Sequence, residues 1–147
     1  MSEVCVSIDI DAAPEEVWDL IMDPNRFDQW VTIHRRLGDV SDIPLKDGST
    51  MDQTLCLRGV NFKVHWRVVE LDPPHRVVFE GRGPARSRAV IREELAAVDG
   101  GTRFSYTNEF HPPGGPLGTV ASRVVIGGVP RREANASLER LKRLIER

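Results

Sequence analysis

The sequence predicts an α+β fold, in which a curved antiparallel sheet of seven strands wraps around a long C-terminal helix and two short helices follow the first strand. The first observation behind this is that residues 31–111 mostly alternate apolar and polar side chains with a period of two. The second is that the turns between these segments are short, which implies antiparallel neighbours. The third is that the only long helical pattern follows residue 111, so that helix must cover the apolar face of the sheet.

The first thirty residues fit a strand followed by two helices. Residues 4–10 place valine or isoleucine at every second position, as in a half-buried strand. A proline and two glutamates at residues 14–16 then favour a first helical turn, where proline loses no hydrogen bond and carboxylates meet the positive end of the dipole. Residues 23–25 end that helix, and a short helix or turn is expected at residues 27–30.

Six further strands are expected, each bounded by turn signals. The alternation is clearest where Met51, Gln53, Leu55 and Leu57 share one face. The expected strands are residues 31–40, 50–58, 62–68, 77–81, 85–94 and 104–110, with turns at residues 47–48, 59–61, 72–74, 83–84 and 99–101.

The C-terminal part is helical in pattern but interrupted. Apolar residues recur at helical spacing over residues 117–125 and again over residues 134–145. Between them lies Gly127-Gly128-Val129-Pro130, and proline inside a helix removes a hydrogen bond. We therefore expect two helical pieces or one kinked helix.

Composition restricts the possible functions. The chain has 147 residues, enough for one domain (residues 1–147), with 40% hydrophobic and 29% charged residues. Its 20 basic and 22 acidic side chains give a net charge of −2, which argues against nucleic acid or an anionic membrane as the main partner. No apolar run is long enough to span a membrane and no signal peptide is visible, so a cytoplasmic protein is expected. Cys5 and Cys56 are expected to be reduced thiols.

Three stretches of the chain, with the end of its last helix, resemble the START-like superfamily, which includes polyketide cyclases and plant pathogenesis-related allergens. The first resembles the opening strand-to-helix signature, the second the proline turn into the next strand, and the third the hairpin before the last strand. The matching segments are residues 10–20 with Asp23-Pro24 and Trp30, residues 67–79, residues 100–104 and residues 138–142. The resemblance implies a helix-grip fold of the SRPBCC type and a ligand cavity between the sheet and the last helix. Separately, the excess of arginine over lysine in the chain is compatible with a GC-rich bacterial source.

If that cavity is present, the alternation of apolar and polar residues along the strands indicates which residues line its wall. Most of the inward positions are apolar, and a packed core is the simpler interpretation for any single one of them. The nominated positions are Met51, Gln53, Leu55, Phe62, Val64, Trp66, Phe79, Ile91, Glu93, Phe104, Tyr106, Asn108 and Phe110. The ligand-binding candidates among them are Gln53, Phe62, Trp66, Phe79, Glu93, Phe104, Tyr106 and Asn108.

The polar candidates are informative because a buried polar group costs free energy unless it has a partner. Gln53, Glu93, Tyr106 and Asn108 share the apolar phase, which indicates either a polar patch in a cavity or strand ends and bulges that turn them to solvent. Glu93, Tyr106 and Asn108 are the weak candidates for catalysis, since a carboxyl in an apolar cavity has a raised pKa and can act as an acid or base. An ion pair between Glu93 and Arg35 is the alternative.

Other chemistries lack support in the sequence. The histidines at positions 34, 65, 75 and 111 lack the spacing of metal ligands, so no metal and no cofactor is expected. His34 follows the turn at Trp30 and is a further candidate for contact with a cavity ligand. Five arginines, residues 82, 86, 88, 92 and 103, are expected on the outer sheet face. Glu80, Glu94 and Glu109 share that face, which favours cross-strand ion pairs over nucleic-acid binding.

Three functions are compatible with these observations. The first is binding of one small hydrophobic or aromatic ligand, such as a lipid, polyketide or quinone. The second is a polyketide cyclase or dehydratase activity that uses the polar cavity residues. The third is a regulator that binds another protein through its outer face or last helix. The sequence is compatible with a monomer or a homodimer.

Overall fold

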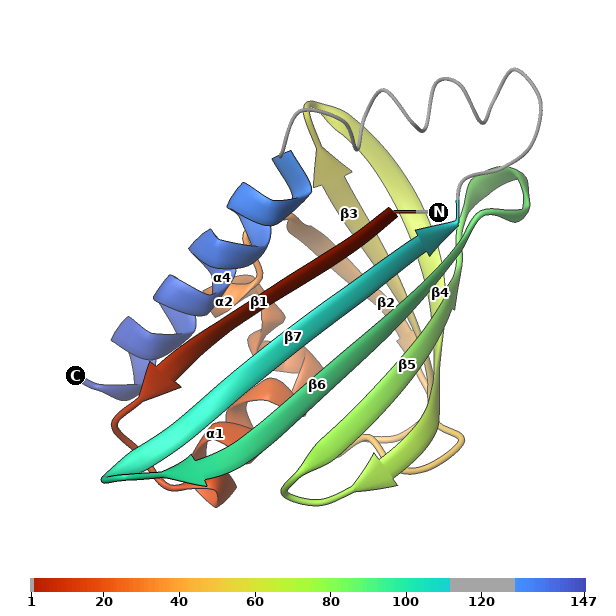
Figure 1. The fold of residues 1–147 in the computed structure, drawn as a ribbon. Helices are drawn as coiled ribbons and strands as arrows, with labels where there is room; N and C mark the ends of the chain where they lie inside the picture. The colour runs from red at the N-terminus through yellow and green to blue at the C-terminus, as the bar shows by residue number, and fades with distance from the viewer. Residues whose placement is uncertain (1, 112–128) are drawn as a thin grey trace.

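The computed structural model describes residues 2–111 and 129–147, and these form one seven-stranded antiparallel sheet with helices on its concave side (Figure 1). The strands lie in the order β1-β7-β6-β5-β4-β3-β2, so β2 to β7 form a meander and β1 closes its end. The elements are β1 (Ser2–Ile10), α1 (Pro14–Ile21), η1 (Pro24–Arg26), α2 (Phe27–Trp30), β2 (His34–Val40), β3 (Thr50–Leu57), β4 (Val60–Asp72), β5 (Arg76–Arg82), η2 (Pro84–Arg86), β6 (Arg88–Val98), β7 (Gly101–His111) and α4 (Val129–Ile145). The predicted helix-grip architecture is confirmed.

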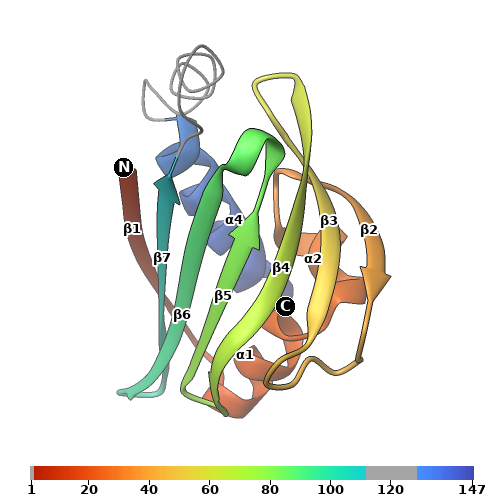
Figure 2. The ribbon, with the colours of Figure 1, turned by 90° about the vertical axis from the view of Figure 1, so that its right-hand side faces the viewer.

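The alternation along the strands determines which face is buried. In β3, buried residues occupy every second position, and in β4 the inward side chains of Val64, Trp66 and Val68 are buried while their neighbours are exposed. A bulge at Val69 shifts the register between β4 and β5, which increases the local bending of the sheet. Figure 2 shows the sheet curving around the helices as a result.

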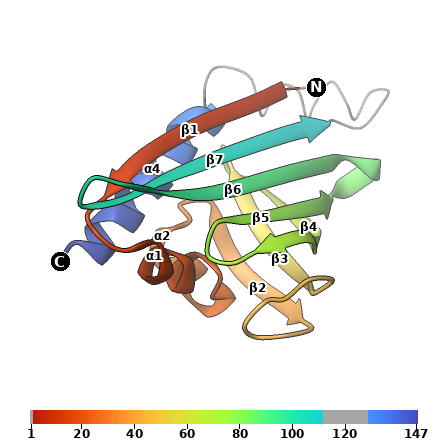
Figure 3. The ribbon, with the colours of Figure 1, turned by 60° about the horizontal axis from the view of Figure 1, so that its bottom comes forward.

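The helices α1 and α2 cover one end of the concave face (Figure 3). Helix α1 buries Val17, Trp18, Leu20 and Ile21, as its apolar spacing predicts. The chain then turns through η1, where the Asp23 carboxylate accepts a hydrogen bond from the backbone N–H of Asn25 at 3.0 Å. This cap directs the chain into α2, whose buried residues are Phe27 and Trp30.

Helix α4 runs alongside β1 and covers the edge of the sheet that β1 forms (Figure 1). Side chains of α4 donate hydrogen bonds to β1 carbonyls that face away from β7, from Arg131 to the Cys5 oxygen at 3.0 Å and from Lys142 to the Asp9 oxygen at 2.7 Å. The Glu146 carboxylate accepts from the Asp11 N–H at 2.8 Å. These bonds satisfy backbone groups that an edge strand would otherwise leave open to another chain.

The structure refines two expected strands. The strand expected at residues 31–40 begins at His34, and the one expected at residues 85–94 is displaced to β6 because η2 precedes it. The predicted helical stripe at 117–125 and most of the Gly127–Pro130 break lie outside the described residues. Cys5 and Cys56 are free thiols.

A close contact between Trp66 and Gly81 shapes the inner face of the sheet. The two residues are paired in register across β4 and β5. A Cβ atom on Gly81 would lie 2.5 Å from Cζ3 of the Trp66 indole and 2.7 Å from a Val64 methyl carbon. Only glycine therefore leaves room for the six-membered ring of the Trp66 indole at this position of β5.

We expect Gly81→Ala to lower the free energy of unfolding by about 1–3 kcal/mol, because the added methyl overpacks this site. Urea unfolding monitored by circular dichroism measures the loss. In the double variant Gly81→Ala/Trp66→Leu the ring is gone, so the added methyl should cost less than it does alone. Additive costs in this double-mutant cycle would contradict the contact as the cause.

Candidate functional site

A cavity of about 720 Å³ lies between the concave face of the sheet and the helices α2 and α4. Most of its wall is apolar, and its size is that of pockets that hold small organic molecules. The apolar wall residues include Leu55, Phe62, Phe79, Ile91 and Phe110 from the strands.

The cavity begins along a line that crosses four neighbouring strands. On one side of the line, Val68, Val77, Leu95 and Phe104 are at most 3% exposed and belong to the packed core. Their inward neighbours on the other side all line the cavity; they are Trp66, Phe79, Glu93 and Tyr106. These four side chains therefore form the floor of the cavity.

Two floor residues and one neighbour are polar. Glu93 and Tyr106 are paired in register across β6 and β7, and Asn108 follows on the same face of β7. The Asn108 amide nitrogen donates to the Tyr106 hydroxyl oxygen at 3.4 Å. The Glu93 side chain is buried, and its Oε2 atom has no hydrogen-bond partner.

Burial changes the ionisation of this group. Loss of hydration raises the pKa of Glu93 from an ordinary 4.5 to about 8. Burial, with a contribution from the nearby Glu93 carboxylate, also raises the pKa of Tyr106. At neutral pH the floor therefore presents two uncharged O–H groups, each able to donate a hydrogen bond into the cavity.

Three buried polar atoms without partners belong to residues of the cavity wall. They are Nε1 of Trp30, Oε2 of Glu93 and Oδ1 of Asn108. The first is a donor, the second belongs to a protonated carboxyl, and the third is an acceptor. Buried polar groups in proteins are almost always paired, so these three atoms are exceptions that leave hydrogen-bonding capacity facing the cavity.

The fourth polar candidate, Gln53, is already satisfied by the protein. Its Oε1 accepts from the Trp66 indole N–H at 3.0 Å, and its Nε2 lies 2.9 Å from Nδ1 of His34. Burial lowers the pKa of His34, which favours the neutral imidazole that can accept this bond. Gln53 thus fixes the Trp66 ring rather than presenting a free polar group.

A second polar cluster fastens helix α4 over the cavity. The Thr32 hydroxyl, just before β2, lies 2.5 Å from the Glu133 carboxylate, and the Thr32 N–H donates to the Ser137 hydroxyl at 3.0 Å. Glu133 and Ser137 also line the cavity. Sequence reasoning missed this cluster because nothing in the local pattern pairs residue 32 with residues a hundred positions later.

The structure brings together twelve of the thirteen nominated positions in the cavity wall. Phe104 is the exception: it is fully buried and packs edge-on against Trp30 at 6.3 Å. Glu93 does not pair with Arg35, whose guanidinium instead lies 3.5 Å from the Cys56 sulfur. The wall residues of α2 and α4, such as Trp30 and Leu138, were not nominated because the strand alternation does not reach them.

The outer face carries some of the expected ion pairs. Arg92 and Glu109 pair at 2.9 Å across β6 and β7, while Glu94 pairs with Arg76 of β5 at 3.2 Å. Arg103 pairs with Asp9 of β1 at 2.9 Å. None of the described helices is both long and apolar enough to cross a membrane.

The comparisons with known proteins agree with this geometry. The sequence profile described as polyketide cyclase / dehydrase and lipid transport matches residues 1–146. The chain belongs to this family. The protein TTHA0849 from Thermus thermophilus shares the fold with a TM-score of 0.80 at 18% identity, over 99% of this chain and 97% of that one.

Two relatives of the family come from Mycobacterium tuberculosis. The uncharacterised protein Rv1546 is 29% identical over 135 residues, which are 89% of this chain and 93% of the relative. The protein named Toxin Rv0910 is 24% identical over 124 residues, which are 83% of this chain and 86% of the relative.

We expect Glu93→Gln to change how the stability of this polyketide cyclase family member depends on pH. Between pH 4.5 and about 8 the unfolded chain has released the Glu93 proton while the folded protein keeps it. The free energy of unfolding should therefore fall by about 1.4 kcal/mol per pH unit in this window because of Glu93, and level off above it. The glutamine variant lacks this loss, so its advantage over the native protein should grow from pH 5 to pH 8.

Urea unfolding at pH 5, 6.5, 8 and 9 measures this difference. Glu94→Gln serves as the matched control, because Glu94 is the next residue of β6 and is half exposed on the outer face. Parallel pH profiles for the native protein and Glu93→Gln would show that Glu93 is not a buried carboxyl with a raised pKa.

Proposed function

We propose that the protein binds one small, largely apolar molecule in its cavity, with residues 1–147 acting as a single START-like ligand-binding domain. The observation that supports this best is the set of unpartnered polar atoms on the wall of an apolar cavity of about 720 Å³. A core built only for stability would leave neither the volume nor the unpaired atoms.

The chemistry of the wall indicates how the ligand is held. A carbonyl oxygen of the ligand would accept from Glu93, Tyr106 or Trp30, and a ligand hydroxyl would donate to the Asn108 amide oxygen. The aromatic side chains of Trp66 and Phe79 offer flat contact surfaces beside these groups. A lipid, polyketide or quinone-like molecule with one or two oxygen functions meets these requirements.

A second candidate function is a cyclisation or dehydration reaction of such a ligand. The observation that favours it is Glu93, whose raised pKa keeps a proton available near neutral pH. A protonated carboxyl beside the Tyr106 hydroxyl could polarise or protonate a ligand carbonyl as negative charge develops there. In that case Glu93 is the acid, and Tyr106 with Asn108 orients the oxygen.

A third candidate, the regulation of a protein partner, follows from the name of the relative Toxin Rv0910. Such a role would use the outer face or α4 and would not require the cavity. A cytoplasmic location, a monomeric or homodimeric state and the absence of a cofactor stay predictions.

We expect the cavity-filling variant Ala89→Phe to lose the ligand. Ala89 is half-buried in the cavity wall, so a benzyl group there takes up space that the ligand needs. Ala96→Phe is the matched control, because residue 96 lies on the same strand but is exposed on the outer face. Native mass spectrometry of freshly purified protein, followed by denaturing extraction, measures the bound mass in each.

The outcomes separate the three candidates. A discrete bound mass that is absent only from Ala89→Phe supports ligand binding, and Tyr106→Phe should then weaken affinity about tenfold, the effect of one hydrogen bond. Turnover that depends on pH and disappears in Glu93→Gln supports catalysis. Native protein that stays empty after incubation with lipids, quinones and aromatic polyketides would contradict both and leave the regulator.

A further inference from the structure

The cavity mouth is the end of the cavity where wall residues are exposed to solvent, among them Val60, Pro84 and Arg131. Positive charges lie side by side on the outer face of the sheet next to this mouth. Arg82 at the end of β5 and Arg88 at the start of β6 are directly opposite each other in register. Arg82 is also opposite His65 of β4, and Arg88 is opposite His111 of β7, so four basic side chains form a row across four strands. Like charges in opposite positions destabilise a sheet, so this arrangement calls for a reason outside the fold itself.

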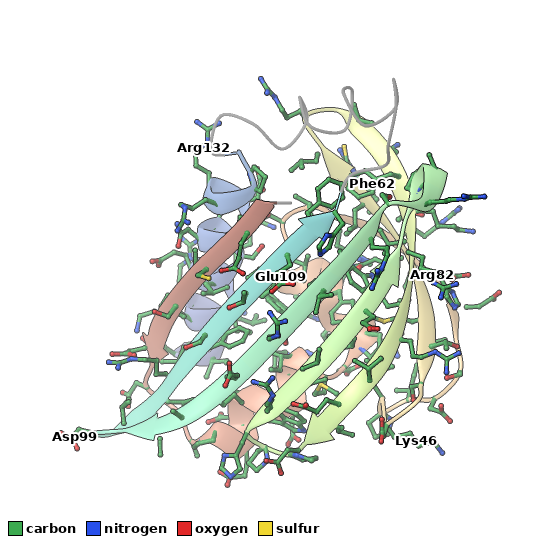
Figure 4. All side chains as sticks on the ribbon, turned by 45° about the vertical axis from the view of Figure 1, so that its right-hand side comes forward. Lys46, Phe62, Arg82, Asp99, Glu109 and Arg132 are labelled. Atoms are coloured by element: carbon green, nitrogen blue, oxygen red, sulfur yellow. The ribbon has the colours of Figure 1, made fainter. Side chains whose placement is uncertain are left out.

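The surroundings of this row add positive charge and little compensation. Lys63 and Arg86 are exposed beside it, and none of the ion pairs of the described residues involves these two or the opposed arginines. The acids at this end are Glu80 next to Arg82, Glu3, which lines the cavity, and Glu109, which pairs with Arg92 and also interacts with His111. Asp52 bonds His65, so the two histidines of the row have acidic neighbours, while no ion pair among the described residues involves the two arginines. Figure 4 shows Arg82 projecting from this face, with Phe62 at the same end and Asp99 at the opposite end.

Apolar side chains project from the same end of the molecule. Val60, at the tip of the β3–β4 hairpin, is 47% exposed and also lines the cavity. Pro84 and Ala85 of η2 are exposed and line it too. Ala85 and Arg86 both adopt left-handed backbone conformations, with φ of 53° and 66°. Such conformations cost free energy in residues other than glycine, so the exposed shape of η2 is strained.

We propose that the basic row, Arg86 and these apolar tips form a docking surface for an anionic lipid bilayer. Cations near such a surface are attracted to anionic headgroups, and exposed apolar side chains between them can enter the boundary with the acyl chains. The mouth of the apolar cavity would then face the lipid, where a hydrophobic ligand could be taken up or released. The surface does not depend on the identity of that ligand.

A nucleic acid would also be attracted by this charge, but the apolar tips favour the bilayer. The described large apolar side chains that are strongly exposed are Ile43, Val60 and Val69, none of which is aromatic. Stacking of unpaired bases, which supports binding of single strands, therefore finds no exposed aromatic platform in the described part of the chain.

Vesicle co-sedimentation tests the proposal. The full chain is mixed with vesicles of phosphatidylcholine alone or with 30% phosphatidylglycerol, in low and high salt. We expect binding to the anionic vesicles at low salt, and about 30-fold weaker binding of Arg82→Gln/Arg88→Gln, since each cation contributes a factor of about 5. The control Arg140→Gln/Arg143→Gln has the same net charge but alters exposed residues further along α4 and should bind as the native protein does.

Urea unfolding checks separately that the arginine variants remain folded. Replacing either opposed arginine relieves repulsion, so Arg82→Gln should unfold at the same or a higher urea concentration than the native protein. A Val60→Asp variant should lose vesicle binding even with all cations present. Equal loss in the α4 control, no binding to anionic vesicles, or tighter binding to a single-stranded RNA than to the vesicles would each overturn the proposal. Vesicle binding is measured by sedimentation and cavity occupancy by native mass spectrometry of the vesicle-free protein, so failure of the first leaves the proposed ligand binding untouched.

Discussion

The helices within residues 2–111 and 129–147 do not extend over the whole concave face of the sheet, and the cavity lies where they end. Helix α1 and the turn after it pack against one end, where Val68, Val77, Leu95 and Phe104 are buried in the core. One inward position further along each strand, none of the described helices fills the space, and a volume of about 720 Å³ lies against the curved sheet. Most of the wall beyond this line is apolar by the same alternation that builds the core, so the cavity continues the core where no described side chain fills it. Closing it would require larger wall residues, and the sequence places Ala89 and Ala134 there instead.

A chain of contacts links strands β5, β4, β3 and β2 on one side of the cavity wall. It begins at Gly81, which has no side chain. Because Gly81 has no Cβ atom, the Trp66 indole lies across β5, and its N–H reaches Gln53 on β3. Gln53 then reaches His34 on β2, so one relay of hydrogen bonds connects β4 through β3 to the edge strand. From the other side, α4 is fixed by Thr32 and by bonds to the β1 carbonyls. The polar floor at Glu93 and Tyr106 lies between these two supports and takes part in neither, which leaves its hydrogen-bonding groups available.

The fold could be predicted from the sequence because each strand alternates apolar and polar residues with a period of two. The same alternation shows which residues face inward, so the candidate wall residues could also be predicted. It could not decide which inward residues pack and which line the cavity, since that depends on where α1 and α2 end in space. Phe104 and Tyr106 are successive inward residues of β7, yet Phe104 packs in the core and Tyr106 lines the cavity. It also could not tell that Gln53 is satisfied while Glu93 is not, because their partners come from other strands. The pairing of Arg82 with Arg88 could not be predicted for a similar reason. The short helix η2 shifts the start of β6, and the length and shape of that connection set which residues of β5 and β6 lie opposite each other.

The distribution of charge limits which part of a ligand can lie where. Inside, the floor has no cationic side chain, and Glu93 stays protonated because ionising it in an apolar wall is unfavourable. A carboxylate or phosphate of a ligand would lose its hydration there and meet the same penalty. At the mouth, Arg88 and Arg131 line the cavity and are exposed to solvent. In the proposed complex a charged group of the ligand would stay at the mouth, beside arginine, and the end that enters would carry only neutral oxygen functions. The cost of burying charge would then set the direction in which such a ligand enters, whatever its chain or ring system is.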